Sequence, residues 1–234
     1  MGTQQSSEAM ALTPVQVRVN KFLASVYGWM ALGLFLTSFM AFFTLASGLF
    51  AAIFSVPFLF YGFLIAEIGL VIYFSVRINK ISIARAKAVF LVYSALNGVT
   101  LSVILLAYTG ASITSTFMVT AGTFGAMAIY GYSTKRDLTS IGSLAFMSLI
   151  GIILASIANM FLKNSGLDSV ITYLGVAIFI GLTAYDSQKM KQIGESQSHD
   201  SEDLKKASIQ GALALYLDFI NLFLFFLRIF GRRR

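Results

Sequence analysis

Long apolar segments separated by short polar connections dominate the hydrophobic pattern of this chain. About 20 apolar residues in an α-helix are enough to cross the hydrocarbon core of a bilayer. Seven segments reach that length, namely residues 22–45, 51–76, 86–108, 113–133, 139–162, 170–190 and 208–230. The pattern therefore predicts an all-α integral membrane protein built as a seven-transmembrane-helix bundle.

Polar residues lie on both sides of this block of segments. We interpret residues 1–21 as a cytoplasmic N-terminal tail, residues 22–230 as a single seven-helix transmembrane domain, and residues 231–234 as a basic C-terminal tail. Composition agrees with a membrane protein, because 57% of the residues are hydrophobic and only 12% are charged. An average soluble domain carries about twice that share of charge.

Lysine and arginine are distributed unevenly among the predicted connections. The N-terminal tail and the second, fourth and sixth connections hold twelve of them, whereas the first, third and fifth hold only Lys163. The twelve are Arg18, Lys21, Arg77, Lys80, Arg85, Lys87, Lys135, Arg136, Lys189, Lys191, Lys205 and Lys206. Because basic connections stay in the cytoplasm, this asymmetry predicts a cytoplasmic N-terminus. It also accounts for the net charge of +7, so we expect no nucleic-acid partner.

The basic C-terminal tail conflicts with that orientation. Seven spans place residues 231–234 outside, together with Arg228, whereas a re-entrant last segment would return them to the cytoplasm. We favour seven spans, because the twelve internal cations outnumber the four at the C-terminal end.

Small residues recur in the fourth and fifth segments. They are Ala121, Gly122, Gly125, Gly131, Gly142, Ser148, Gly151 and Ala155. Small residues one turn apart let helix backbones approach closely in a membrane. We interpret them as packing residues rather than as a pore lining.

Metal and thiol chemistry have few candidate residues. The chain has no cysteine, which excludes disulfides, thiolate metal sites and cysteine catalysis. The one histidine, His199, lies in a polar connection and has no second histidine to form a metal site with. We expect no cofactor.

Three carboxylates interrupt the apolar segments. Asp218 lies within residues 211–230, Asp186 follows the apolar stretch 170–185, and Glu67 lies in the second segment. An aspartate at the centre of a membrane helix costs about 3 kcal/mol on insertion scales. Each of these groups therefore needs a hydrogen-bond partner, a bound cation or a proton.

Asp218 belongs to one helix face of small and polar residues. That face comprises Gly211, Ala214, Asp218, Asn221, Phe225 and Arg228, at steps of three and four residues. Such a face turns toward protein or a water-filled cavity. Asn221, one turn beyond Asp218, can donate to the carboxylate or offer its oxygen to a cation. On the sixth segment, Lys189 follows Asp186 by one turn.

Asp186 and Asp218 lie on consecutive segments and could meet. Two carboxylates at hydrogen-bonding distance share one proton and titrate in two coupled steps. Loss of that proton creates repulsion between the helices, or an anionic oxygen site suited to Ca²⁺. The pair is therefore our candidate pH sensor and gate, and our candidate calcium site. A protonated pair that only joins two helices is the alternative.

Three strings resemble bacterial members of the transmembrane Bax inhibitor motif family. They are Gly181-Leu-Thr-Ala-Tyr-Asp-Ser-Gln-Lys-Met190, Tyr93-Ser-Ala-Leu-Asn-Gly-Val-Thr-Leu-Ser102, and Leu213-Ala-Leu-Tyr-Leu-Asp-Phe-Ile-Asn-Leu-Phe-Leu-Phe-Phe-Leu-Arg-Ile-Phe-Gly231. The resemblance implies a multi-pass protein of the bacterial inner membrane with the last helix central. It also implies a pH-sensitive calcium leak gated by an aspartate pair, here Asp186 and Asp218. By the same resemblance, Glu67 belongs to the ion pathway and Arg77 is the candidate latch for Asp186.

Two other functions compete with the leak. Intramembrane aspartyl proteases also use two membrane aspartates, and Tyr185-Asp186 matches their first motif, but Leu215-Tyr-Leu-Asp218 stands where Gly-x-Gly-Asp is required. We therefore expect no enzyme. The stronger alternative is a regulatory or interaction protein that acts on membrane protease quality control or stress survival. In that case the aspartate pair is structural, and residues 1–21 or 191–207 contact a membrane-protein partner. The expected partners of the leak are the lipid bilayer, calcium ions and protons, and the sequence leaves the oligomeric state open.

Overall fold

The structure is a computed structural model that describes residues 13–196 and 202–234. Its helices are α2 (Pro14–Ala46), α3 (Leu49–Phe54), α4 (Pro57–Arg77), α5 (Ile83–Ala107), α6 (Gly110–Ser133), α7 (Thr139–Leu162), α8 (Ser165–Ser196) and α9 (Glu202–Phe230). All except α3 are long and apolar enough to cross a membrane, which gives seven candidate spans among the described residues. The predicted all-α, seven-helix class is confirmed.

Local capping starts the first helix earlier than predicted. Pro14 occupies the first turn, where its missing N–H is not needed. The Thr13 hydroxyl accepts a hydrogen bond from the Gln16 amide, and the Gln16 side chain accepts one from the Thr13 amide. This capping box satisfies N–H groups that would otherwise lack partners. Residues 14–21 of the predicted tail are therefore helical, and residues 1–12 lie outside the described part.

Two predicted boundaries are wrong for physical reasons. The second span, predicted over 51–76, is broken between α3 and α4, because Pro57 tolerates only the first turn of a helix. The predicted connection 191–207 is largely helical, since α8 continues to Ser196 and α9 begins at Glu202. Polar residues extend both helices past their apolar parts. Residues 197–201, including His199, lie outside the described part.

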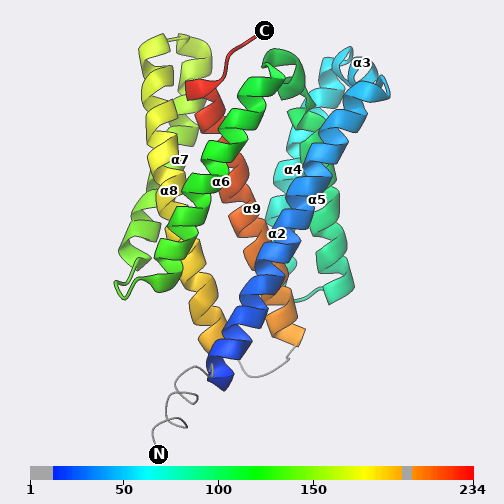
Figure 1. Ribbon diagram of the computed structural model, residues 1–234. Helices are drawn as coiled ribbons and strands as arrows, with labels where there is room; N and C mark the ends of the chain where they lie inside the picture. Colours follow the sequence, from blue (N-terminus) through cyan, green and yellow to red (C-terminus); the bar gives the residue numbers. More distant parts are fainter. Residues whose placement is uncertain (1–12, 197–201) are drawn as a thin grey trace, which may run out of the picture.

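Helix α9 lies among four other helices. It packs against α2, α5, α6 and α8, and it is seen between α2 and α6 in Figure 1. In the 18-residue apolar stretch of α9, 56% of the residues are buried. In the corresponding stretch of α4, which packs mainly on α5, only 6% are buried. Helix α9 is therefore enclosed by protein, whereas α4 is peripheral.

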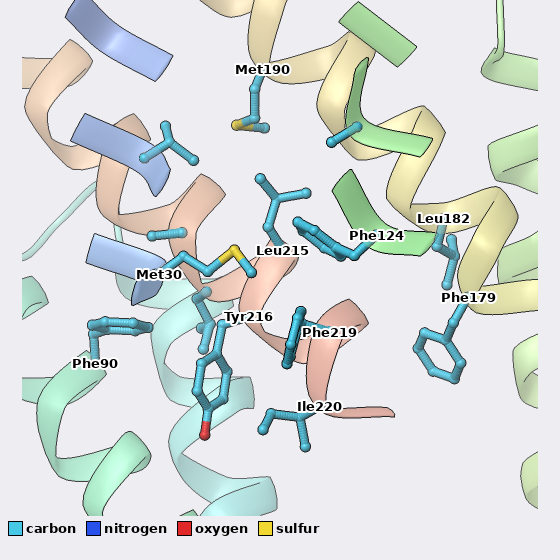
Figure 2. Close-up of a cluster of buried hydrophobic side chains, with 14 of the residues drawn as sticks. Met30, Phe90, Phe124, Phe179, Leu182, Met190, Leu215, Tyr216, Phe219 and Ile220 are labelled. Atoms are coloured by element: carbon cyan, nitrogen blue, oxygen red, sulfur yellow. The ribbon is translucent and has the colours of Figure 1, made fainter. Parts of the chain in front are cut away.

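Aromatic side chains fix the rotation of α9 about its own axis. Tyr216 lies edge-on to Phe90 of α5, with ring centroids 5.9 Å apart. Phe219 lies edge-on to Phe124 of α6 at 5.5 Å. Figure 2 shows these rings around α9. Edge-to-face pairs of this kind stabilise packing beyond the apolar area that they bury.

Two glycines allow close helix contacts, as the small-residue pattern predicts. A Cβ on Gly131 would meet the backbone of Ala184, and one on Gly142 would meet the ring of Tyr185. The prediction is wrong for three other glycines, which have nothing within 4 Å of such an atom: Gly122, Gly125 and Gly151. Among the glycines of this pattern, close approach is therefore limited to the contacts of α6 and α7 with α8.

The described ends of the chain lie at opposite ends of the bundle (Figure 1). Helix α9 is uninterrupted, so the re-entrant alternative is wrong. The segment after α9 pairs with the turn between α5 and α6. The Thr109 amide donates to the Arg232 carbonyl at 3.1 Å, the Arg234 amide to the Ala107 carbonyl at 3.1 Å, and the Arg232 amide to the Ser112 hydroxyl at 2.7 Å.

Candidate functional site

Helices α8 and α9 bring Asp186 and Asp218 together. Their carboxyl groups lie within hydrogen-bonding reach of each other. Since an ionised carboxylate can only accept, such a bond requires a proton on one of the two. Asp218 is only 4% exposed, and its Oδ2 atom receives no hydrogen bond from any donor of the described residues. A hydrogen bond between the two acids would therefore need one shared proton.

The acid pair lies in a cavity of about 720 Å³ between α7, α8 and α9. Asp186, Asp218 and Asn221 contribute polar groups from α8 and α9. Helix α7 adds the hydroxyls of Thr139 and Ser143. Most of the remaining lining is apolar. A small ion or water molecules would meet their polar contacts at the two acids.

Asn221 is positioned by its own helix. Its Nδ2 atom donates to the Leu217 carbonyl at 2.8 Å, which uses one of its two N–H donors. The amide oxygen is the remaining acceptor. The inward face predicted for Asp218 and Asn221 agrees with this placement.

Lys189 shares the cavity with the two acids. Its Nζ atom lies 5.8 Å from the centroid of the Tyr185 ring, and its charge acts on the Asp186 carboxyl. The sequence shows that Asp186 and Lys189 are one helical turn apart. It does not show that α7 lies beside them and completes the cavity. Lys189 is therefore a site residue that the sequence pattern does not predict.

Glu67 belongs to a different polar cluster. It accepts hydrogen bonds from Thr100 Oγ1 at 2.8 Å and from Asn97 Nδ2 at 3.4 Å. The Tyr216 hydroxyl donates to Asn97 Oδ1 at 3.2 Å and shares a 2.7 Å hydrogen bond with the Thr37 hydroxyl. None of these residues lines the cavity at the aspartate pair. The structure therefore does not bring Glu67 to Asp186 and Asp218.

Arg77 lies at the exposed end of α4. Among the described acidic residues none forms an ion pair with it. The latch to Asp186 stays a prediction that no contact here supports. The cation beside Asp186 is Lys189.

The two acids provide few ligands for a metal ion. No group of three or more His, Cys, Asp or Glu side chains gathers anywhere in the described part. Calcium takes six to eight oxygen ligands, and two carboxyls with the Asn221 oxygen provide at most five. The donor set suits a cation that passes, with water completing its shell, better than a resident one.

Comparison with known proteins identifies the chain. The sequence model of the family described as inhibitor of apoptosis-promoting Bax1 matches residues 19–234. The chain belongs to this Bax inhibitor family. Among its relatives, the inner membrane protein YbhL of Escherichia coli is 53% identical over 218 residues, which cover 92% of this chain and 93% of that protein.

Other members of the Bax inhibitor family are similar over almost their whole length. A protein of Borreliella burgdorferi is 48% identical, covering 92% of this chain and 93% of its own. A protein of Deinococcus radiodurans is 39% identical, covering 98% and 99%. With seven apolar helices and a close inner-membrane relative, this Bax inhibitor family member is a multi-pass inner membrane protein.

Proposed function

We propose that the protein is a pH-sensitive, calcium-permeable leak whose gate is the pair Asp186 and Asp218. The observation that carries the proposal is the close approach of these two acids inside a cavity. An intramembrane carboxylate is costly to keep unless it is used, and here two lie together. We further propose that the N-terminus is cytoplasmic, on the charge asymmetry of the connections.

The state of the gate depends on whether the aspartate pair holds the shared proton. While one acid is protonated, the hydrogen bond holds α8 to α9 and the cavity stays closed beyond the pair. When pH rises and the proton leaves, two like charges repel in a medium of low dielectric. The helices separate, and the two carboxylates with the Asn221 oxygen attract a hard cation. Flux is therefore expected to rise with pH.

Calcium entry into liposomes tests the proposal. The wild-type protein should admit Ca²⁺ with a rate that rises with pH. Asp186→Asn and Asp218→Asn should each give a low rate without the wild-type pH dependence, because the one remaining carboxylate has no like charge to repel it. Asp168→Asn is the matched control on α8, since Asp168 lies outside the cavity and forms an exposed ion pair with Arg228 at 3.7 Å.

Unchanged flux in both cavity variants, with the fold intact, would contradict the leak. The pair would then only join α8 to α9, and the regulatory or interaction protein would be the better proposal. A fall in thermal stability of both variants, without any change in flux, would support that alternative directly.

A further inference from the structure

We propose that Lys189 is a built-in counter-cation of the aspartate pair, which occupies the entrance of the cavity and restrains the leak. This inference rests on the proposed leak function and adds a regulatory residue to its site. In a site that attracts cations, a resident ammonium group competes with the ion that would pass.

The three charged residues of the cavity lie at different depths. Asp218 is buried, Asp186 is half-buried and Lys189 is exposed, and all three line the same cavity. A cation that reaches Asp218 from the exposed side of this cavity passes Lys189 first. The ammonium group therefore repels the ion at the entrance and also competes for Asp186.

An aromatic ring holds the ammonium group near the acids. Lys189 Nζ lies 5.8 Å from the centroid of Tyr185, within range of a cation–π interaction. The ring itself packs against Gly142 of α7, where a Cβ would overlap it. Lys189 has a long, flexible stem, and Asp186 lies one turn away on the same helix. The side chain can therefore move between the ring and the carboxyl.

Among the residues that the structure describes, no other cation lines the cavity. Helix α7 contributes hydroxyls such as Thr139 and Ser143, and α9 contributes Asp218 and Asn221. On the remaining sides of α8, charged and titratable groups have other partners. Arg18 of α2 donates to the Gly194 and Glu195 carbonyls, and Lys191 donates to the Tyr132 carbonyl of α6. Lys189 is therefore the side chain that can compensate the negative charge of the aspartate pair.

Replacement of Lys189 by methionine tests this role in reconstituted full-length protein. Lys189→Met should raise the Ca²⁺ flux at high pH about fivefold or more, because a unit charge close to the pathway is removed. The midpoint of the flux–pH profile should move to higher pH, since the positive charge that favours the ionised pair is gone. Lys189→Arg should keep the wild-type rate and midpoint.

Lys191→Met is the matched control. It removes the same charge from the same helix, but Lys191 lies over the ring of Tyr132, 5.1 Å from its centroid, and does not line the cavity. It should leave rate and midpoint unchanged. Lys189→Gln serves in place of the methionine variant if that variant does not fold.

The outcomes separate this inference from the leak itself. If Lys189→Met behaves like Lys191→Met while Asp186→Asn abolishes the pH dependence, the counter-cation role is wrong and the leak stands. If a purely structural role were correct, stability would fall without a shift of the midpoint. If the aspartate variants also leave flux unchanged, both proposals fail together.

Discussion

Tyr216 and Asp218 are separated by one residue, yet their polar atoms belong to different clusters. Each residue turns an α-helix by about 100°, so the two side chains leave α9 on nearly opposite sides. Tyr216 reaches Asn97 and Thr37, whereas Asp218 reaches Asp186. One helix therefore carries a neutral hydrogen-bond network on one side and the acid pair on the other.

The separation of these clusters predicts a stability effect without a gating effect. Tyr216 is fully buried, so Tyr216→Phe leaves Thr37 and Asn97 short of a partner. The expected loss is about 1–2 kcal/mol of unfolding free energy, measured by thermal unfolding in detergent. The flux–pH midpoint should not move.

Tyr173→Phe is the control for that experiment, because Tyr173 is 64% exposed on α8. It should change neither stability nor flux. A shift of the flux midpoint in Tyr216→Phe alone would show that the network around Glu67 and Asn97 belongs to the gate after all.

At the scale of helices, a close backbone contact brings α6 against α8. A Cβ on Gly131 would meet the carbonyl and Cα of Ala184, and Ala184 precedes Asp186 by two residues. Gly131→Ala should therefore push the helices apart and cost about 1–3 kcal/mol, as measured by thermal unfolding. The same displacement should alter the pH dependence of flux.

Gly125 provides the comparison within α6. It has open space where its Cβ would lie, so Gly125→Ala should be tolerated or slightly stabilising, because alanine favours helix over glycine. Equal destabilisation by both substitutions would mean that helix propensity, not the contact with Ala184, decides the outcome at Gly131.

The helices also show how much of the fold and of the candidate site can be predicted from the sequence. The lengths of the apolar segments predicted seven spans, and the spacing of polar residues predicted the inward face of α9 with Asp218 and Asn221. Helix ends were missed, because polar residues extend α8 and α9 without an apolar signal. The partners of Glu67 and the role of Lys189 were missed because both depend on which helices are neighbours. Hydrophobic periodicity on a single helix does not contain that information.

At the scale of the whole molecule, the absence of native cysteine makes the orientation measurable. Lys135 is exposed in the connection between α6 and α7, and this connection lies at the end of the bundle opposite the C-terminus (Figure 1). With the N-terminus in the cytoplasm, an impermeant maleimide should label Arg234→Cys in intact spheroplasts. It should label Lys135→Cys only after permeabilisation. Labelling of both variants from one side would contradict seven complete spans.

The pairing of the segment after α9 with the α5–α6 turn has a consequence for biogenesis. In the proposed orientation Arg232, Arg233 and Arg234 cross the membrane against an inside-negative potential, at about 2.3 kcal/mol per charge per 100 mV. Three charges make this roughly 7 kcal/mol, which the hydrogen bonds at Ala107, Thr109 and Ser112 recover only in part. Translocation of this segment is thus uphill until its docking turn exists. We therefore expect the α5–α6 hairpin to assemble first and α9 to insert into a nearly complete bundle.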